Sequence, residues 1–142
     1  MSTEIRPELS RKNKYWISKH RYYELKHFCL QYNEFKDLCA YLEGLTKSEK
    51  FPVGKIQKNV LDPVGKSVEQ LLYFKHLTEL IEKASEMTDP DISFYILKGV
   101  TDGLSFTQLK MRYGLPYERD AYYLRYRKFF YILNLLRMEE YL

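Results

Sequence analysis

The most informative part of the sequence is GLSFTQLKMRYGLPY, residues 103–117. Ser105 and Gln108 have the spacing of a capping box, in which each side chain satisfies a free backbone N–H at the start of a helix. Gly103 and Gly114 suit the left-handed residues that close helices. The stretch therefore predicts a short helix between the two glycines, followed by a tight turn.

A second helix is expected directly after this turn. Pro116 fits its first position, where the missing N–H costs nothing. The residues that follow are basic and rich in tyrosine. A short capped helix, a tight turn and a basic helix are the parts of a helix-turn-helix DNA-binding unit. We therefore predict that double-stranded DNA is contacted by Lys110, Arg112, Tyr117, Arg119, Tyr122, Tyr123, Arg125 and Arg127.

The predicted contacts form two groups, one for bases and the groove wall and one for phosphates. We expect Tyr117, Arg119, Tyr122 and Tyr123 near base edges or the groove wall, and the remaining cations on phosphates, because arginine forks onto guanine while lysine and arginine neutralise the backbone. A solvated basic face with half-buried tyrosines at its edge would produce the same pattern. The pattern therefore favours nucleic acid as the partner without excluding this alternative.

The rest of the chain is predicted to be helical as well. It has no sustained alternation of polar and apolar residues, which is the pattern of a half-buried strand. We expect an all-α helical bundle made of a flexible basic arm at residues 1–14, an N-terminal helical part at 15–88, and a helix-turn-helix unit with an extended C-terminal helix at 89–142.

Helix limits follow from the same signals. One long helix is expected over residues 15–42 and a lysine-rich loop over residues 44–62. Asp62-Pro63 and Asp89-Pro90 each start a further helix, with aspartate as the cap and proline at the first position. The end of the last helix, through Leu133 and Leu136, is apolar. It must pack on the first two helices or on another copy of the chain.

Several function classes are disfavoured by the composition. Cys29 and Cys39 lie ten residues apart on one predicted helix, roughly 15 Å along its axis, and cannot bridge each other. The three histidines are scattered, and we find no carboxylate pair, phosphate-binding glycine loop or metal-ligand spacing. We therefore expect no enzyme activity, metal or cofactor. No apolar run has membrane-spanning length, so we expect a cytoplasmic protein without a membrane partner.

Charge is distributed unevenly along the chain. Residues 1–27 hold seven Lys or Arg against three Asp or Glu, residues 28–97 hold eight against eleven, and residues 98–142 hold eight against five. The net charge of +4 thus comes from both ends of the chain. Positive ends around an acidic middle indicate two surfaces that can approach a polyanion.

Residues 95–105, YILKGVTDGLS, together with the Gly114-Leu115 turn, resemble sigma-factor region 4. The wider layout, with KYWISKHRYYELK at residues 14–26, resembles phage late-gene transcriptional regulators of the RinA and ArpU type. The resemblance covers about residues 15–137. It implies a phage or prophage transcription regulator that works in the bacterial host cell, reads a promoter site and can also contact host RNA polymerase.

The chain departs from that pattern at the start of the predicted recognition helix. Glu118 and Asp120 stand where the family usually has a Ser or Thr cap. Carboxylates stabilise a helix N-terminus but repel phosphates, although they can accept a hydrogen bond from a cytosine amino group. Two alternatives therefore stay open: a phage accessory protein that binds and inhibits a host protein, and the small subunit of a terminase, which would form a ring.

Overall fold

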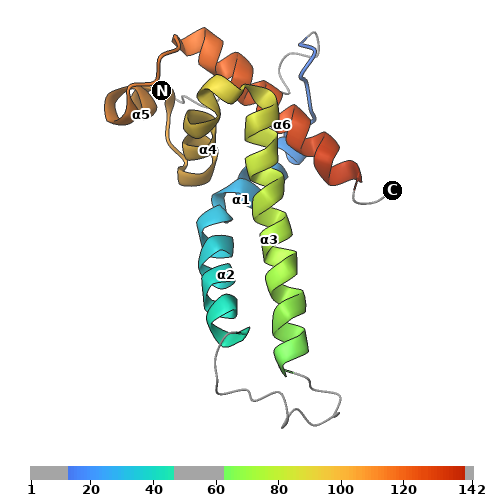
Figure 1. Cartoon of the computed structure of the whole chain (residues 1–142). Coiled ribbons are helices and arrows are strands. Elements are labelled where there is room, and N and C mark those ends of the chain that lie inside the picture. The colour runs from blue at the N-terminus through green and yellow to red at the C-terminus, as the bar shows by residue number, and fades with distance from the viewer. Residues whose placement is uncertain (1–12, 47–62, 140–142) are drawn as a thin grey trace. The chain divides into compact units, whose positions relative to one another are not determined.

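The computed structural model describes residues 13–46 and 63–139, and within these ranges the chain forms helices and turns without a β-strand. The predicted all-α class is confirmed (Figure 1). The elements in chain order are α1 (Lys19–Leu30), α2 (Tyr32–Thr46), α3 (Pro63–Thr88), the 3-10 helix η3 (Pro90–Ile92), α4 (Ser93–Asp102), α5 (Phe106–Tyr113) and α6 (Arg119–Glu139).

The chain forms two compact units. The first consists of Met1–Gln31 and Leu80–Leu142, and the second of Tyr32–Glu79. The boundaries between the two units therefore fall at the end of α1 and within α3. Most of the expected arm (residues 1–12) and of the expected loop (residues 47–62) lies outside the described residues.

The single long helix expected over residues 15–42 is wrong, because the structure has two helices with a break at Gln31. The backbone of Gln31 has φ −88° and ψ 0°, and its N–H donates to the carbonyl of Phe28 at 3.2 Å. This three-residue spacing is that of a 3-10 turn, which winds more tightly than an α-helix. The break therefore needs neither glycine nor proline, and the sequence carries no signal for it.

A helix begins at the proline of both predicted Asp-Pro starts. α3 begins at Pro63, while Asp62 lies outside the described residues. The side chain of Asp89 accepts from the backbone N–H of Asp91 at 3.0 Å, and Pro90 stands at the first position of η3. η3 leads directly into α4, so the second start opens with one 3-10 turn before the α-helix begins.

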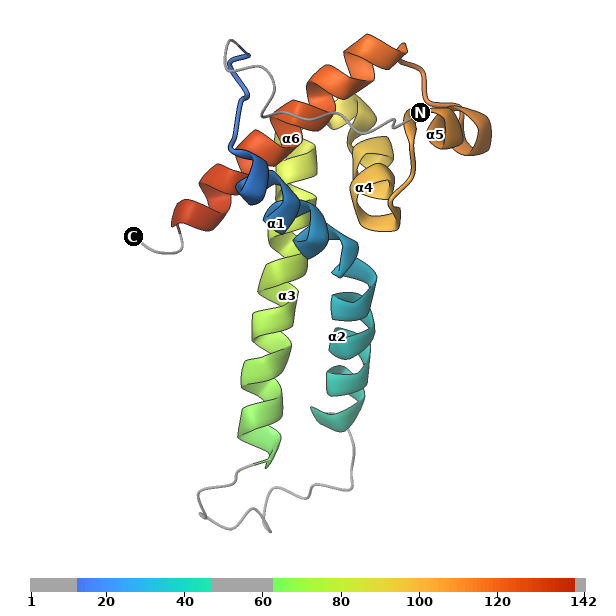
Figure 2. The ribbon, with the colours of Figure 1, turned by 180° about the vertical axis from the view of Figure 1, so that it is seen from behind.

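The first unit is held together by α6, which contacts α1, α4 and α5 (Figure 2). Its apolar half packs against α1, which is the first part of one of the two helices expected as its partners. The hydroxyls of Tyr22 and Tyr126 lie 2.6 Å apart, and Phe130 packs edge-on against both rings, with centroids at 5.1 and 4.9 Å. The largest fully buried side chains of the unit are Tyr22, Leu25, Ile81, Ile92, Ile96, Leu109, Leu115, Tyr122, Phe129, Phe130 and Leu133.

The second unit contains α2 and the first part of α3. Cys39, Leu42 and Leu71 form its buried cluster, and Phe35 stacks on Phe74 at 5.9 Å between ring centroids. Both cysteines of the chain are free, as predicted, and both are buried, with Cys29 in the first unit. Burial raises the pKa of the Cys29 thiol far above its ordinary value.

Candidate nucleic-acid interface

The local geometry of α5 follows the prediction closely. The N–H of Gln108 donates to Ser105 Oγ at 3.2 Å, and the N–H of Ser105 donates to Gln108 Oε1 at 2.9 Å, which completes the capping box. Gly103 and Gly114 close their helices at φ +68° and +67°. These are left-handed conformations that glycine adopts without strain. The short helix is therefore fixed at both ends.

The start of α6 differs from the prediction. The helix begins at Arg119, so Pro116 lies in the linker and not at a first helical position. The N–H of Tyr122 donates to the carbonyl of Glu118 at 2.9 Å, which makes Glu118 the residue that precedes the helix. The linker is anchored by Leu115, which is fully buried.

Gly99 allows α4 to approach α6 and α5 closely. A Cβ atom at this position would collide with the Tyr122 hydroxyl and would stand 3.2 Å from Leu109 Cδ1. The carbonyl of Gly99 also accepts from the N–H of Leu104 at 3.1 Å, across the turn to α5. One small residue therefore sets the spacing of the three C-terminal helices.

Tyr122 and Tyr123 do not occupy the groove-facing positions expected from the sequence. Their side chains are 1% and 7% exposed and pack among the helices. The Tyr122 hydroxyl has no hydrogen-bond partner among the described residues, and burial raises the pKa of Tyr122 well above its ordinary value. Neither ring can reach a base edge without unpacking the first unit, so both are core residues.

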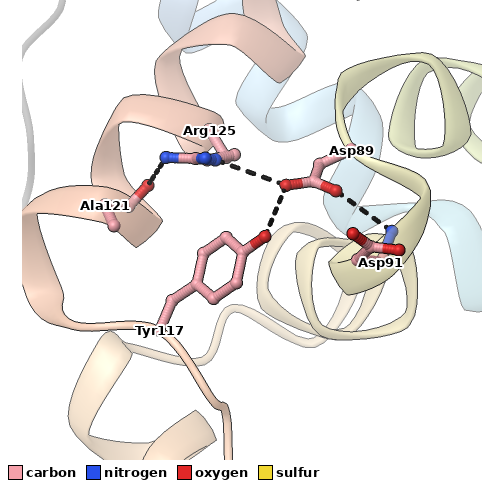
Figure 3. A network of polar contacts seen from close by, with 5 residues as sticks. All are labelled: Asp89, Asp91, Tyr117, Ala121 and Arg125. Atoms are coloured by element: carbon pink, nitrogen blue, oxygen red, sulfur yellow. Dashed lines mark hydrogen bonds and ion pairs between the residues drawn. The ribbon is translucent and has the colours of Figure 1, made fainter.

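Tyr117 and Arg125 are brought together by Asp89 (Figure 3). The Tyr117 hydroxyl donates to Asp89 Oδ2 at 2.9 Å, and Arg125 Nε donates to the same oxygen at 3.3 Å. Arg125 also donates from Nη1 to the carbonyl of Ala121 at 3.2 Å, and its guanidinium lies over the Tyr117 ring at 4.9 Å. The Asp89 side chain is 14% exposed and that of Arg125 is 32% exposed.

The network has a defined effect on the pKa values of its members. Burial alone would raise the pKa of the Asp89 carboxyl, but the bonds from Tyr117, the Asp91 amide and Arg125 outweigh it and hold that pKa below its ordinary value. The pKa of Tyr117 is raised, first because its hydroxyl donates to Asp89. In the sequence Asp89 is recognisable only as a helix cap, because nothing local connects it with side chains 28 and 36 residues away.

We expect Asp89→Asn to change how stability depends on pH. A carboxyl whose pKa is lower in the folded state stabilises the fold at pH values above the pKa that it has in the unfolded chain, here 3.8. This stabilisation is lost as the pH falls through the pKa of the folded state. Urea unfolding from neutral pH down to about pH 2.5 should therefore show a difference between wild type and variant that shrinks below pH 4. Asp91→Asn is the control, since its side chain makes none of these bonds. A difference that does not vary with pH would contradict the role of Asp89.

Four of the predicted DNA contacts lie outside the Asp89 network and are at least partly exposed. Arg112 and Arg119 are exposed, and Arg127 is partly exposed. Lys110 is exposed too, but it donates to the carbonyl of Tyr117 at 3.3 Å and lies 3.8 Å from Glu118. Arg119 lies over the ring of Tyr123 at 5.3 Å, which supports the guanidinium at the first turn of α6.

Two carboxylates share this end of α6. The Glu118 side chain is 91% exposed, and Asp120 is exposed in the first turn of the helix. Both favour the helix N-terminus electrostatically. The surface around the α5–α6 turn is thus of mixed charge, and Arg112 and Arg119 are its two cations that form no ion pair with a described residue.

No protein-family model, curated protein or solved structure matches this chain. The likeness to sigma-factor region 4 and to the phage regulators therefore stays a prediction. Among the described residues, no group of three or more His, Cys, Asp or Glu side chains is placed to hold a metal ion. The helices in the same part of the chain are too short or too polar to cross a bilayer.

Proposed function

We propose that the protein is a phage or prophage transcription regulator that reads a DNA site through α5 and α6. The observation that carries this proposal is the pair of exposed arginines, Arg112 and Arg119, on either side of a glycine turn between α5, whose ends are both capped, and α6. A helix-turn-helix unit reads base edges from the N-terminal residues of its second helix. Arg119 stands at that position in α6.

The roles within the interface differ from those expected from the sequence. Arg119 reads a base edge in the major groove, while Arg112, Lys110 and Arg127 hold phosphates. Tyr122 and Tyr123 form the support beneath the helix, because both rings are buried. Tyr117 orients Arg125 through Asp89. Host RNA polymerase and a second copy of the chain are further partners that we propose for such a regulator.

The test is selection of a random duplex pool by the purified protein at ~0.15 M salt, where purely electrostatic binding is already weak. We expect an enriched motif, and half-site symmetry within it would identify a dimer. Circular dichroism of the same sample establishes that the protein is folded. A folded protein that enriches no motif would overturn the proposal.

Arg119→Ala and Arg112→Ala should have different effects on binding. We expect Arg119→Ala to cost about 1–3 kcal/mol on the selected site and to relax the preference at one base pair. Arg112→Ala should weaken binding to selected and random duplexes equally and lower the salt slope by about 1. Fluorescence anisotropy with both duplexes measures the two effects. Equal losses on both duplexes for both variants would contradict the assignment of Arg119.

A second candidate function is inhibition of a host protein through the same surface. Glu118, 91% exposed beside exposed Asp120, favours it, because two carboxylates at the turn would repel a phosphate backbone. A stoichiometric complex with a host protein, together with negligible affinity for duplex DNA, would establish this function. Glu118→Gln would then weaken that complex, whereas under the first proposal it strengthens DNA binding.

A further inference from the structure

An open hollow of about 300 Å³ lies on the flank of α6, beside the Asp89 network. Its walls come from three parts of the first unit: Tyr15 before α1, the turn between α3 and η3 that includes Asp89, and Leu124, Arg125 and Lys128 of α6. The volume is far above the ~10–15 Å³ that a single water needs. The hollow is therefore large enough for a polar group of a ligand.

Two cations, Arg125 and Lys128, and one carboxylate, Asp89, line the hollow. Lys128 is partly exposed and makes no hydrogen bond or ion pair with any described residue. Arg125 uses Nε and Nη1 in the Asp89 network, and its Nη2 makes no hydrogen bond within the described ranges. The Asp89 carboxylate is the negative group, and its oxygens already accept from Tyr117, Arg125 and the Asp91 amide. The hollow thus presents donors for an anion.

We propose that this hollow receives a phosphate of the DNA backbone, with Lys128 and Arg125 Nη2 as the two donors. The proposal rests on the DNA-binding function proposed above and adds a contact to it. Lysine serves a phosphate as a compact point charge, and arginine adds a donor of fixed direction. Asp89 acts as a positioning residue, because it holds the guanidinium before DNA arrives and so lowers the entropy lost on binding.

The position along α6 agrees with this role. Lys128 follows Arg119 by nine residues of one continuous helix, which corresponds to about 13 Å along the axis and about two and a half turns, so the two side chains leave opposite sides of α6. The major groove is ~12 Å wide and has a phosphate wall on either side, so a helix that holds Arg119 at the base edges can bring Lys128, on its opposite side, to the phosphates of one groove wall. The exposed side chain of Leu124 lies between the two positions, on the same helix.

The test compares Lys128→Met with wild type on the selected duplex and on a random duplex. Loss of one phosphate contact should lower the slope of log affinity against log salt by about 0.9 for both duplexes. A methylphosphonate scan of the selected duplex should reveal one neutralised phosphate that weakens wild type but not Lys128→Met. Lys83→Met is the matched control, because Lys83 is an exposed lysine of the first unit outside the hollow.

The outcomes separate this inference from the proposed function. The inference alone would be overturned if wild type enriches a motif and Lys128→Met has the same salt dependence and the same response to methylphosphonates as wild type. Wild type that binds no duplex would overturn both. Inorganic phosphate at constant ionic strength is the remaining probe. Phosphate that stabilises wild type saturably but not Lys128→Met, while the slope of log DNA affinity against log salt is the same for both, would assign the hollow to a free anion. That result would overturn the DNA contact.

Discussion

Phe130→Ala is expected to lower the free energy of unfolding by about 3–5 kcal/mol, more than any other substitution proposed for this chain. The Phe130 ring is 1% exposed and packs against Tyr22, Tyr126 and Phe129, with centroids 4.9 to 5.1 Å away. Its removal leaves a cavity where α6 meets α1, and the aromatic rings around it cannot collapse fully into that space. Urea unfolding followed by circular dichroism measures the free energy of unfolding.

Leu135→Ala is the control for this prediction. Leu135 lies on the same helix, but its side chain is 44% exposed. We expect its removal to change the free energy of unfolding by no more than about 0.5 kcal/mol, as for most surface positions. Similar losses for the two variants would mean that α6 is not packed as described.

Gly99→Ala is expected to destabilise the protein, although alanine favours a helix over glycine by about 1 kcal/mol. The new methyl group would collide with the Tyr122 hydroxyl, and overpacking of a buried site costs typically about 1–3 kcal/mol. Gly44→Ala provides the opposite control. Gly44 also lies in a helix, but a Cβ there meets nothing within 4 Å, so this substitution should be stabilising.

A double-mutant cycle with Tyr122→Phe identifies the colliding atom. The Tyr122 hydroxyl is buried without a partner among the described residues, so its removal relieves a desolvation penalty of about 1–3 kcal/mol. We therefore expect Tyr122→Phe to be neutral or stabilising, and Gly99→Ala to be tolerated in its presence. Strictly additive effects would show that the hydroxyl does not set the spacing of α4 and α6.

The elements that are determined locally are the ones best predicted from the sequence. The capping box of Ser105 and Gln108 and the left-handed Gly103 and Gly114 each depend on residues within four positions of one another, and all are found. The start of α3 at Pro63 is of the same kind. The break at Gln31 escapes prediction, because a single residue with ψ near 0° leaves no compositional signal.

The candidate site is predicted less well, since it depends on which face of α6 is buried. Tyrosine is amphipathic, and five tyrosines between Lys110 and Lys128 do not identify by type which of them face the core. Tyr122 is buried where the absence of a side chain at Gly99 leaves room for its hydroxyl, a contact across 23 residues. Arg125 likewise depends on Asp89, 36 residues away. Tertiary contacts, and not local pattern, therefore decide which side chains of α6 are left for a partner.

The distribution of the two cysteines gives each compact unit a reporter of its own. Cys29 is fully buried in the first unit, and Cys39, 8% exposed, is buried in the second. A thiolate reacts with an alkylating reagent only when it is accessible, so modification requires local or global opening. Timed alkylation of the unaltered protein, read by mass spectrometry of the two peptides, would measure the opening of the two units separately. If added duplex slows the alkylation of Cys29 but not that of Cys39, DNA binding stabilises the first unit and not the second. This experiment needs neither a label nor a substitution.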